Sequence, residues 1–175
     1  MSTEKNKARR QMLTIMGIAL VTLGGSYMLF FFASSGLGWG TTNNGQFVNP
    51  PLTTSDLGWS ETEADRVWWV WVVADNQCAA DCDQMVKDMR ALHILLNREA
   101  SRVRRAVTSI SHAEVLLSEP FPKLERVSVK RPDLVQRGVY VVDPNGNLVF
   151  FYAMSVDPKL IKEDLKKLLR VSQIG

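Results

Sequence analysis

The chain has 175 residues, a formal net charge of +3 and only two cysteines. Four of its 21 basic residues lie within the first ten positions, so the remainder is nearly balanced in charge and offers no electrostatic argument for binding nucleic acid. The sequence contains no phosphate-binding loop, dinucleotide fingerprint or paired zinc motif, and no motif places either histidine with a serine. These absences argue against hydrolases and nucleotide-dependent enzymes.

Residues 12–33 contain no charged side chain, and a helix of this length crosses the roughly 30 Å hydrocarbon core of a bilayer. Basic residues precede the segment and none follows before Arg66, so the positive-inside rule predicts a cytoplasmic tail at residues 1–11 and an outward-facing remainder. We therefore predict a single-pass anchor in the inner (cytoplasmic) membrane with a periplasmic domain. A signal peptide cleaved at residues 33–35 is the alternative, although such peptides usually have a shorter apolar stretch of about 7–15 residues.

The segment after the anchor, residues 34–60, is polar and rich in turn-forming residues, which predicts a linker. Residues 61–175 then form one small domain with a single core. In that domain, residues 67–73 form a continuous apolar run, VWWVWVV, typical of a strand buried on both faces. A helix is predicted over residues 83–99, where apolar side chains follow the helical period at Met85, Met89, Leu92 and Leu96.

A second strand is predicted over residues 102–110, which are rich in valine and isoleucine. Residues 112–137 are interrupted by three prolines and indicate only a short helix and an edge strand at residues 126–129. Residues 139–152 predict a β-hairpin around the turn sequence DPNGN, and Asp157 as N-cap with Pro158 begins a final helix. This order predicts an α/β fold: a single transmembrane helix followed by a thioredoxin-like domain, in which helices flank a central sheet.

The two cysteines, Cys78 and Cys82, lie between the apolar strand and the first helix of the domain. Residues four apart on a helical turn have Cα atoms about 6 Å apart, which suits a disulfide, and the outward compartment is oxidising. The reduced pair could instead bind Cu(I) through two thiolates, or exchange with a partner's thiols. A helix N-terminus lowers a thiol pKa, whereas Asp81 and Asp83 next to the pair oppose that effect.

A copper site would need a third ligand. His93 lies 11 residues beyond Cys82 on the same helix, about 16 Å away, and is interpreted as a boundary histidine with a structural partner. His112, which follows the second predicted strand, is a candidate ligand. Met85 is another, because it would complete a C-x-x-x-C-x-x-M site, but methionine at this spacing is also an ordinary core residue.

The combination of a membrane anchor, a tryptophan-rich strand, C-x-x-x-C opening a helix and the late segment VYVVDPNGNLVFFY…DPKLIKEDLKKLL resembles the Sco/SenC group of thioredoxin-like proteins. The resemblance covers roughly residues 61–172 and is nearest to a short, divergent, membrane-anchored branch. It implies a role in copper delivery to, and assembly of, cytochrome c oxidase. The partner would be an oxidase subunit or another assembly factor, and the metal would be Cu(I).

The chain departs from the pattern of that group at several positions. Members that bind copper use two cysteines and a histidine shortly before the hairpin, but residues 132–138 contain no histidine. Ala79 and Asp83 replace the prolines that typically flank the cysteines, and Gly138 stands where thioredoxins carry a cis-proline. The copper-binding histidine of the group therefore has no counterpart in that segment.

These observations predict a membrane-anchored, periplasm-facing, Sco-like accessory protein that handles Cu(I) or partner thiols through Cys78 and Cys82. One alternative is a thiol–disulfide oxidoreductase. Another is a non-catalytic, membrane-tethered interaction module in which the cysteines form a structural disulfide. The fold alone does not decide among them.

Overall fold

The computed structural model describes residues 2–34, 42–59, 66–75, 78–111, 115–117 and 120–173. It divides into two compact units, Met1–Thr42 and Asn43–Gly175, which are described separately.

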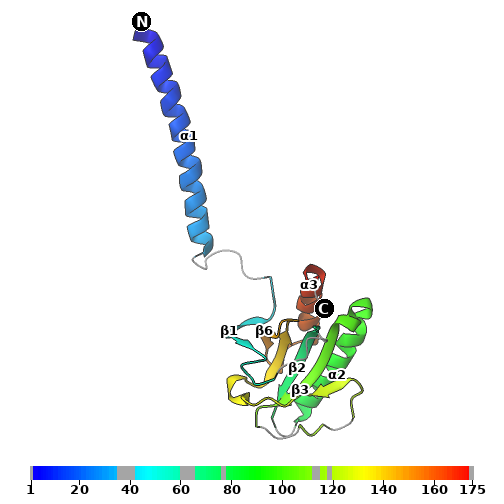
Figure 1. Cartoon of the computed structure of the whole chain (residues 1–175). Coiled ribbons are helices and arrows are strands. Elements are labelled where there is room, and N and C mark those ends of the chain that lie inside the picture. Colours follow the sequence, from blue (N-terminus) through cyan, green and yellow to red (C-terminus); the bar gives the residue numbers. More distant parts are fainter. Residues whose placement is uncertain are drawn as a thin grey trace. The chain divides into compact units, whose positions relative to one another are not determined.

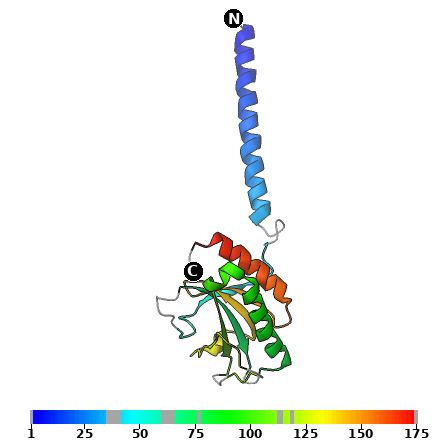
Figure 2. The ribbon, with the colours of Figure 1, turned by 90° about the vertical axis from the view of Figure 1, so that its right-hand side faces the viewer.

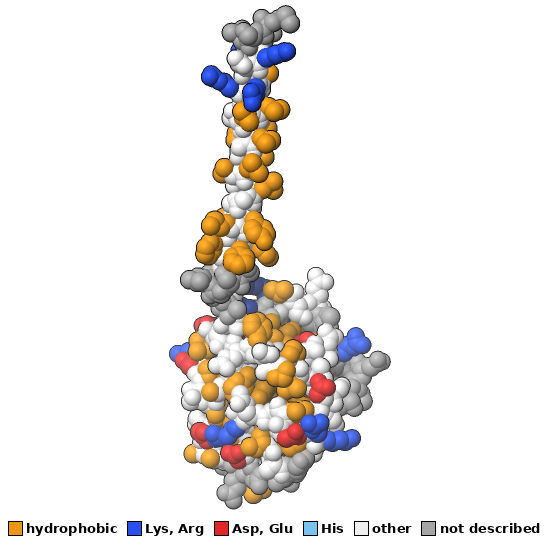
Figure 3. All heavy atoms as spheres, turned by 90° about the vertical axis from the view of Figure 1, so that its left-hand side faces the viewer, with side chains coloured by type: hydrophobic (Ala, Val, Ile, Leu, Met, Phe, Trp, Pro, Cys, Tyr) orange, Lys and Arg blue, Asp and Glu red, His pale blue; other side chains and the backbone are white. Residues whose placement is uncertain are grey.

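The first unit contains one long helix, α1 (Ser2–Ser34). Its stretch Lys5–Phe32 has a mean hydropathy of 1.9 and is the one helix in the described part of the chain that is long and apolar enough to cross a membrane. Apolar side chains surround the helix, and lysines and arginines gather near its N-terminal end (Figure 3). This composition suits a membrane anchor or a signal sequence. The predicted orientation across the membrane stays a prediction.

The second unit is built on a mixed six-stranded sheet with the order β1-β6-β5-β2-β3-β4 (Figure 1). The strands are β1 (Gln46–Thr53), β2 (Trp68–Ala74), β3 (Val103–Ser109), β4 (Leu124–Arg126), β5 (Gly138–Val142) and β6 (Asn147–Tyr152). The central strand β2 runs parallel to β3 and antiparallel to β5, and β5 and β6 form the predicted hairpin.

Two helices, α2 (Ala80–Leu95) and α3 (Pro158–Val171), cover one face of the sheet (Figure 2). The side chains of β2 alternate between this helical face, where Val70 and Val72 lie, and the opposite face, where Trp69 and Trp71 lie. The opposite face is covered by loop residues, including Leu57, Val127, Val129 and Val135. The prediction of a strand buried on both faces is confirmed, since every residue of β2 is buried.

The helix ends follow local signals. Asp157 accepts a hydrogen bond from the backbone N–H of Lys159 at 2.9 Å, so the predicted N-cap of α3 is confirmed. The helix predicted over residues 83–99 instead begins at Ala80 and ends at Leu95, followed by the 3-10 helix η2 (Asn97–Arg102). Asn97 has a φ of 52°, a left-handed conformation that stops an α-helix.

The predicted linker at residues 34–60 is wrong in its second half, because the compact unit begins at Asn43 and includes β1 as an edge strand paired with β6. The register shifts between Phe47 and Leu52, so Pro50 and Pro51 lie in an irregular part of the strand, where missing N–H donors are tolerated. Sequence patterning missed this strand because its polarity and prolines resemble those of a loop.

The segment between β3 and β5 also differs in detail from the prediction. The edge strand expected at residues 126–129 is β4, two residues earlier, since Val127 and Val129 turn inward to the core on the face opposite the helices. The short helix expected in this segment is the 3-10 turn η3 (Pro132–Leu134).

Candidate functional site: the disulfide at the start of α2

Cys78 and Cys82 form a disulfide, with their Cα atoms 5.2 Å apart, close to the spacing predicted from the sequence. Cys78 follows the C-terminal end of β2, and Cys82 lies in the first turn of α2. Cys82 is completely buried in the core under the helices, whereas Cys78 packs at the edge of that core and stays partly exposed. The two sulfurs therefore differ in access, and only the first cysteine of the pair is open to a reagent from solvent.

The backbone around the disulfide belongs to a helix start that has no side-chain cap. Ala79 is the N-cap of α2 and makes no side-chain hydrogen bond to the first turn. The N–H of Cys82 donates to Oδ1 of Asp81 at 2.8 Å, and the N–H of Cys78 donates to the carbonyl of Leu116 at 3.4 Å. The positive end of the helix dipole thus lies at the disulfide, where it favours negative charge on a sulfur.

The charges next to the disulfide are arranged differently from what the sequence suggested. Nη2 of Arg137 lies 2.6 Å from each carboxylate oxygen of Asp81, and Nε of Arg137 lies 3.3 Å from Oδ2 of Asp75. Asp83 lies 3.0 Å from Nζ of Lys87. The prediction that Asp81 and Asp83 oppose thiol ionisation is therefore weakened, because a cation pairs with each of them.

The Arg137 pair also affects ionisation directly. The hydrogen bond from Arg137 is the main cause that holds the pKa of Asp81 below its ordinary value. The same hydrogen bond raises the pKa of Arg137. Both groups thus stay charged over the whole range in which thiols react.

Sequence reasoning missed Arg137. It directly precedes Gly138, the first residue of β5, and Gly138 pairs with Val73 of β2. This register places the segment before β5 beside the C-terminal end of β2 and the start of α2. The sequence did contain a signal for it. In the stretch where the Sco/SenC resemblance expects a histidine, the chain has Arg137 next to Gly138.

Of the other predicted site residues, Met85 and His93 have structural surroundings away from the disulfide. Met85 is 3% exposed and packs in the core under the helices, as an ordinary core methionine does. Nε2 of His93 lies 3.0 Å from the carbonyl of Ala100 and 2.9 Å from that of Val103, which supports its interpretation as a structural boundary histidine. His112 lies outside the described residues. Among the residues that are described, no three His, Cys, Asp or Glu side chains are grouped to hold a metal.

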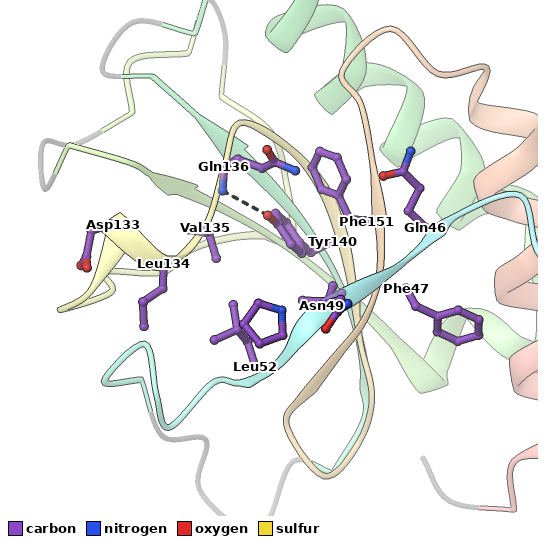
Figure 4. A pocket seen from close by; sticks show the side chains of 12 residues that line it. Gln46, Phe47, Asn49, Leu52, Asp133, Leu134, Val135, Gln136, Tyr140 and Phe151 are labelled. Atoms are coloured by element: carbon purple, nitrogen blue, oxygen red, sulfur yellow. Dashed lines mark hydrogen bonds between the residues drawn. The ribbon is translucent and has the colours of Figure 1, made fainter.

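A separate cavity of about 470 Å³ lies on the face of the sheet opposite α2. Tyr140 and Phe151 of the hairpin line it together with residues of β1 and of the η3 segment (Figure 4). The hydroxyl of Tyr140 accepts a hydrogen bond from the N–H of Gln136 at 3.1 Å. Apolar side chains gather in the middle of the face on the β1 side, with charged residues around them (Figure 3). Neither cysteine lines this cavity.

Residues 68–172 match the family of transmembrane-like, thioredoxin-like, C-terminal domains. The chain belongs to this family. No curated protein matches the chain in a sequence comparison.

Solved structures similar to this family member include three Sco proteins. Apo Sco1 from Thermus thermophilus has 12% sequence identity and a TM-score of 0.52, covering 75% of this chain and 99% of its own. Yeast Sco1 with copper bound has 13% identity and a TM-score of 0.50, covering 76% and 96%. BsSco, a member of the Sco family of cytochrome c oxidase assembly proteins, has 15% identity and a TM-score of 0.44, covering 76% and 99%. At these identities the likeness to the two Sco1 structures concerns the fold alone. Together with the family match, it confirms the predicted thioredoxin-like domain and its resemblance to the Sco/SenC fold.

Proposed function

We propose that this protein is a membrane-anchored, periplasm-facing, Sco-like accessory protein of cytochrome c oxidase assembly, and that it exchanges disulfides with a partner's cysteines through Cys78 and Cys82. The observation that carries this proposal is the asymmetric disulfide at the start of α2, with Cys78 partly exposed and Cys82 buried. An exposed sulfur is open to attack. The helix N-terminus stabilises the thiolate that leaves from Cys82 and so opposes the cost of burying that charge.

The exchange would proceed in two steps that balance atoms and electrons. A partner thiolate attacks Sγ of Cys78, the Cys78–Cys82 bond breaks, and the electron pair moves to Sγ of Cys82. A second partner thiolate then attacks the partner's own sulfur in the mixed disulfide and releases the thiolate of Cys78. The partner leaves as a disulfide, and the two electrons stay on the reduced pair of this chain.

Copper handling is the second candidate, and the donor set supports it less well. Two thiolates suit Cu(I), but they exist only after the disulfide is reduced. Met85 is enclosed in the core, and Arg137, which is a cation and no ligand, occupies the stretch from which a histidine was expected. Copper would then be a cargo held by two sulfurs. The third candidate, a structural disulfide in an interaction module, predicts that small thiols do not reduce the pair while the domain stays folded.

Trapping a mixed disulfide tests the exchange. The Cys82→Ser variant of the full chain, in a nonionic detergent, should form a mixed disulfide with a peptide whose two cysteines are oxidised to a disulfide. The matched variant Cys78→Ser should form little, because its remaining cysteine is buried. Equal trapping by both variants, or by neither, would overturn the proposal.

Two further measurements separate the alternatives. A Cu(I) titration of the reduced full chain against a competing chelator should show no copper held more tightly than by the Cys78→Ser/Cys82→Ser variant. One copper per chain, lost in that variant, would favour copper handling instead. In cells, the same double variant should lower cytochrome c oxidase activity in membranes, and unchanged activity would favour a structural disulfide.

A further inference from the structure

Three carboxylates, those of Asp75, Asp81 and Asp83, lie in the short stretch that contains both cysteines. The nucleophile in disulfide exchange is a thiolate, which is itself an anion. Unpaired carboxylates at this place would repel an approaching thiolate and slow its attack on Cys78. The pairing of these carboxylates therefore bears on which thiols the disulfide accepts.

Arg137 is the residue that pairs with two of them from a distant part of the chain. Its guanidinium contacts Asp81 through Nη2 at 2.6 Å and Asp75 through Nε at 3.3 Å. It thereby joins the end of β2, the first turn of α2 and the start of β5, the three elements around the disulfide. Oδ1 of Asp81 also accepts the N–H of Cys82, so the same ion pair is fixed to the turn that holds the buried sulfur.

The positive charge of Arg137 remains accessible, because 31% of its side chain is exposed. A charge at a solvent-exposed position acts on an incoming ion over about a Debye length, near 8 Å at physiological salt. An ion that comes within this distance of the guanidinium is therefore affected by its charge without contacting it.

We propose that Arg137 is a specificity-determining, positioning residue of the disulfide: by cancelling the charge of Asp81 beside Cys78, it admits anionic thiols that the carboxylates would otherwise repel. This inference rests on the proposed thiol exchange. The bond changes are those given above, with the thiol reagent as the reductant that is oxidised.

The test measures the rates at which three small thiols of different charge reduce the full chain in a nonionic detergent at one pH. Mercaptoacetate is anionic beyond its thiolate, mercaptoethanol is neutral, and cysteamine is cationic. In Arg137→Gln, the ratio of the mercaptoacetate rate to the cysteamine rate should fall about fivefold to tenfold, as the loss of one nearby charge in a water-like dielectric predicts. The fall should shrink at high salt. A role confined to structure would change the three rates alike and would not respond to salt.

Further variants keep the test valid even if one of them does not fold. Arg137→Gln/Asp81→Asn removes one charge of each sign and should restore the wild-type ratio. Asp81→Asn alone should raise the ratio, and Arg137→Lys should keep it near the wild-type value. The matched control is Arg131→Gln, since Arg131 pairs with Asp133 in the same segment before β5 but contacts neither Asp75 nor Asp81.

The outcomes also separate this inference from the proposed function. If none of the three thiols reduces the wild-type disulfide, the proposed exchange fails. If all three reduce it and Arg137→Gln leaves their ratio unchanged, or changes it no more than Arg131→Gln does, only the role of Arg137 is overturned.

Discussion

Two aspartates organise two regions of this domain in opposite ways. Asp164 of α3 has a side chain that is 1% exposed, whereas the side chain of Asp81 of α2 is 53% exposed. Each collects hydrogen bonds from segments far away in the sequence. The buried one fixes the architecture of the domain, and the exposed one sets the charge beside the disulfide.

Asp164 is surrounded by donors. Its carboxylate accepts hydrogen bonds from the backbone N–H groups of Asn44 at 2.6 Å and Gly45 at 2.9 Å, and from the hydroxyl of Tyr152 at 3.0 Å. Burial, reinforced by the negative charge of Asp164, raises the pKa of Tyr152 far above its ordinary value, so the tyrosine stays protonated and donates. This network attaches the first residues of the compact unit to α3 and to β6.

The pairing of Asp81 with Arg137 differs in that water reaches both partners. An exposed ion pair rearranges at little cost, since water replaces each lost contact. A buried carboxylate cannot, because its donors would be left unpaired away from water. The comparison teaches that an aspartate can have two roles. The buried Asp164 holds segments of the domain in fixed positions, whereas the exposed Asp81 can change its ionic contacts, and solvent access makes the difference.

The largest effect expected from this comparison is that of Asp164→Ala. The change leaves two backbone N–H groups and the hydroxyl of Tyr152 without their acceptor, which should lower the free energy of unfolding by about 3 kcal/mol. Chemical denaturation of the full chain in detergent, followed by tryptophan fluorescence, measures it. Asp164→Asn, which keeps one acceptor oxygen, should lose less. A loss below about 1 kcal/mol for the alanine variant would break the comparison.

The next effect concerns the backbone next to the disulfide. A Cβ on Gly138 would lie 2.5 Å from the carbonyl oxygen of Tyr152 and would also meet the ring of Phe151. Gly138→Ala should therefore lower the free energy of unfolding by about 1–3 kcal/mol, as overpacking does. Such a loss would show that the backbone in this region is tightly packed, although the charged side chains beside it are exposed and can rearrange. An unchanged denaturation midpoint would contradict that view.

Arg137→Gln should cost much less stability than Asp164→Ala, although it removes contacts to two carboxylates. Its partners are more than half exposed, and exposed ion pairs contribute little. The two variants should be compared in the same denaturation experiment. Equal losses would mean that Arg137 is an architectural residue like Asp164, and the distinction between the two regions would fall.

The smallest effect is the pH dependence of that contribution. Because Arg137 lowers the pKa of Asp81 below 3.8, the stability from this pair is present above that value and is lost as the pH falls through the depressed pKa of the folded state. The difference in stability between the wild type and Arg137→Gln should therefore be constant near neutral pH and should vanish in strong acid. A difference that persists at about pH 2 would assign the contribution to packing of the Arg137 side chain, not to its charge.

Features with a local signal could be predicted from the sequence. The apolar run of β2, the hairpin around Asp143 and the cap of α3 by Asp157 were all recognised, because each depends on residues a few positions apart. The close approach of Cys78 and Cys82 belongs here as well, because they are only four residues apart in the chain, although Cys78 precedes α2 and only Cys82 lies in its first turn.

Features that join distant segments were decided only by the tertiary structure. The pairing of β1 with β6, the carboxylate of Asp164 between Asn44 and Tyr152, and the contact of Arg137 with Asp81 link residues up to 120 positions apart. No period or spacing in the sequence signals such a contact, because it exists only once the sheet has brought its strand ends together. The sequence alone thus determined the thioredoxin-like elements and their cysteine pair. The packing of the sheet determined which charged residues lie around that pair.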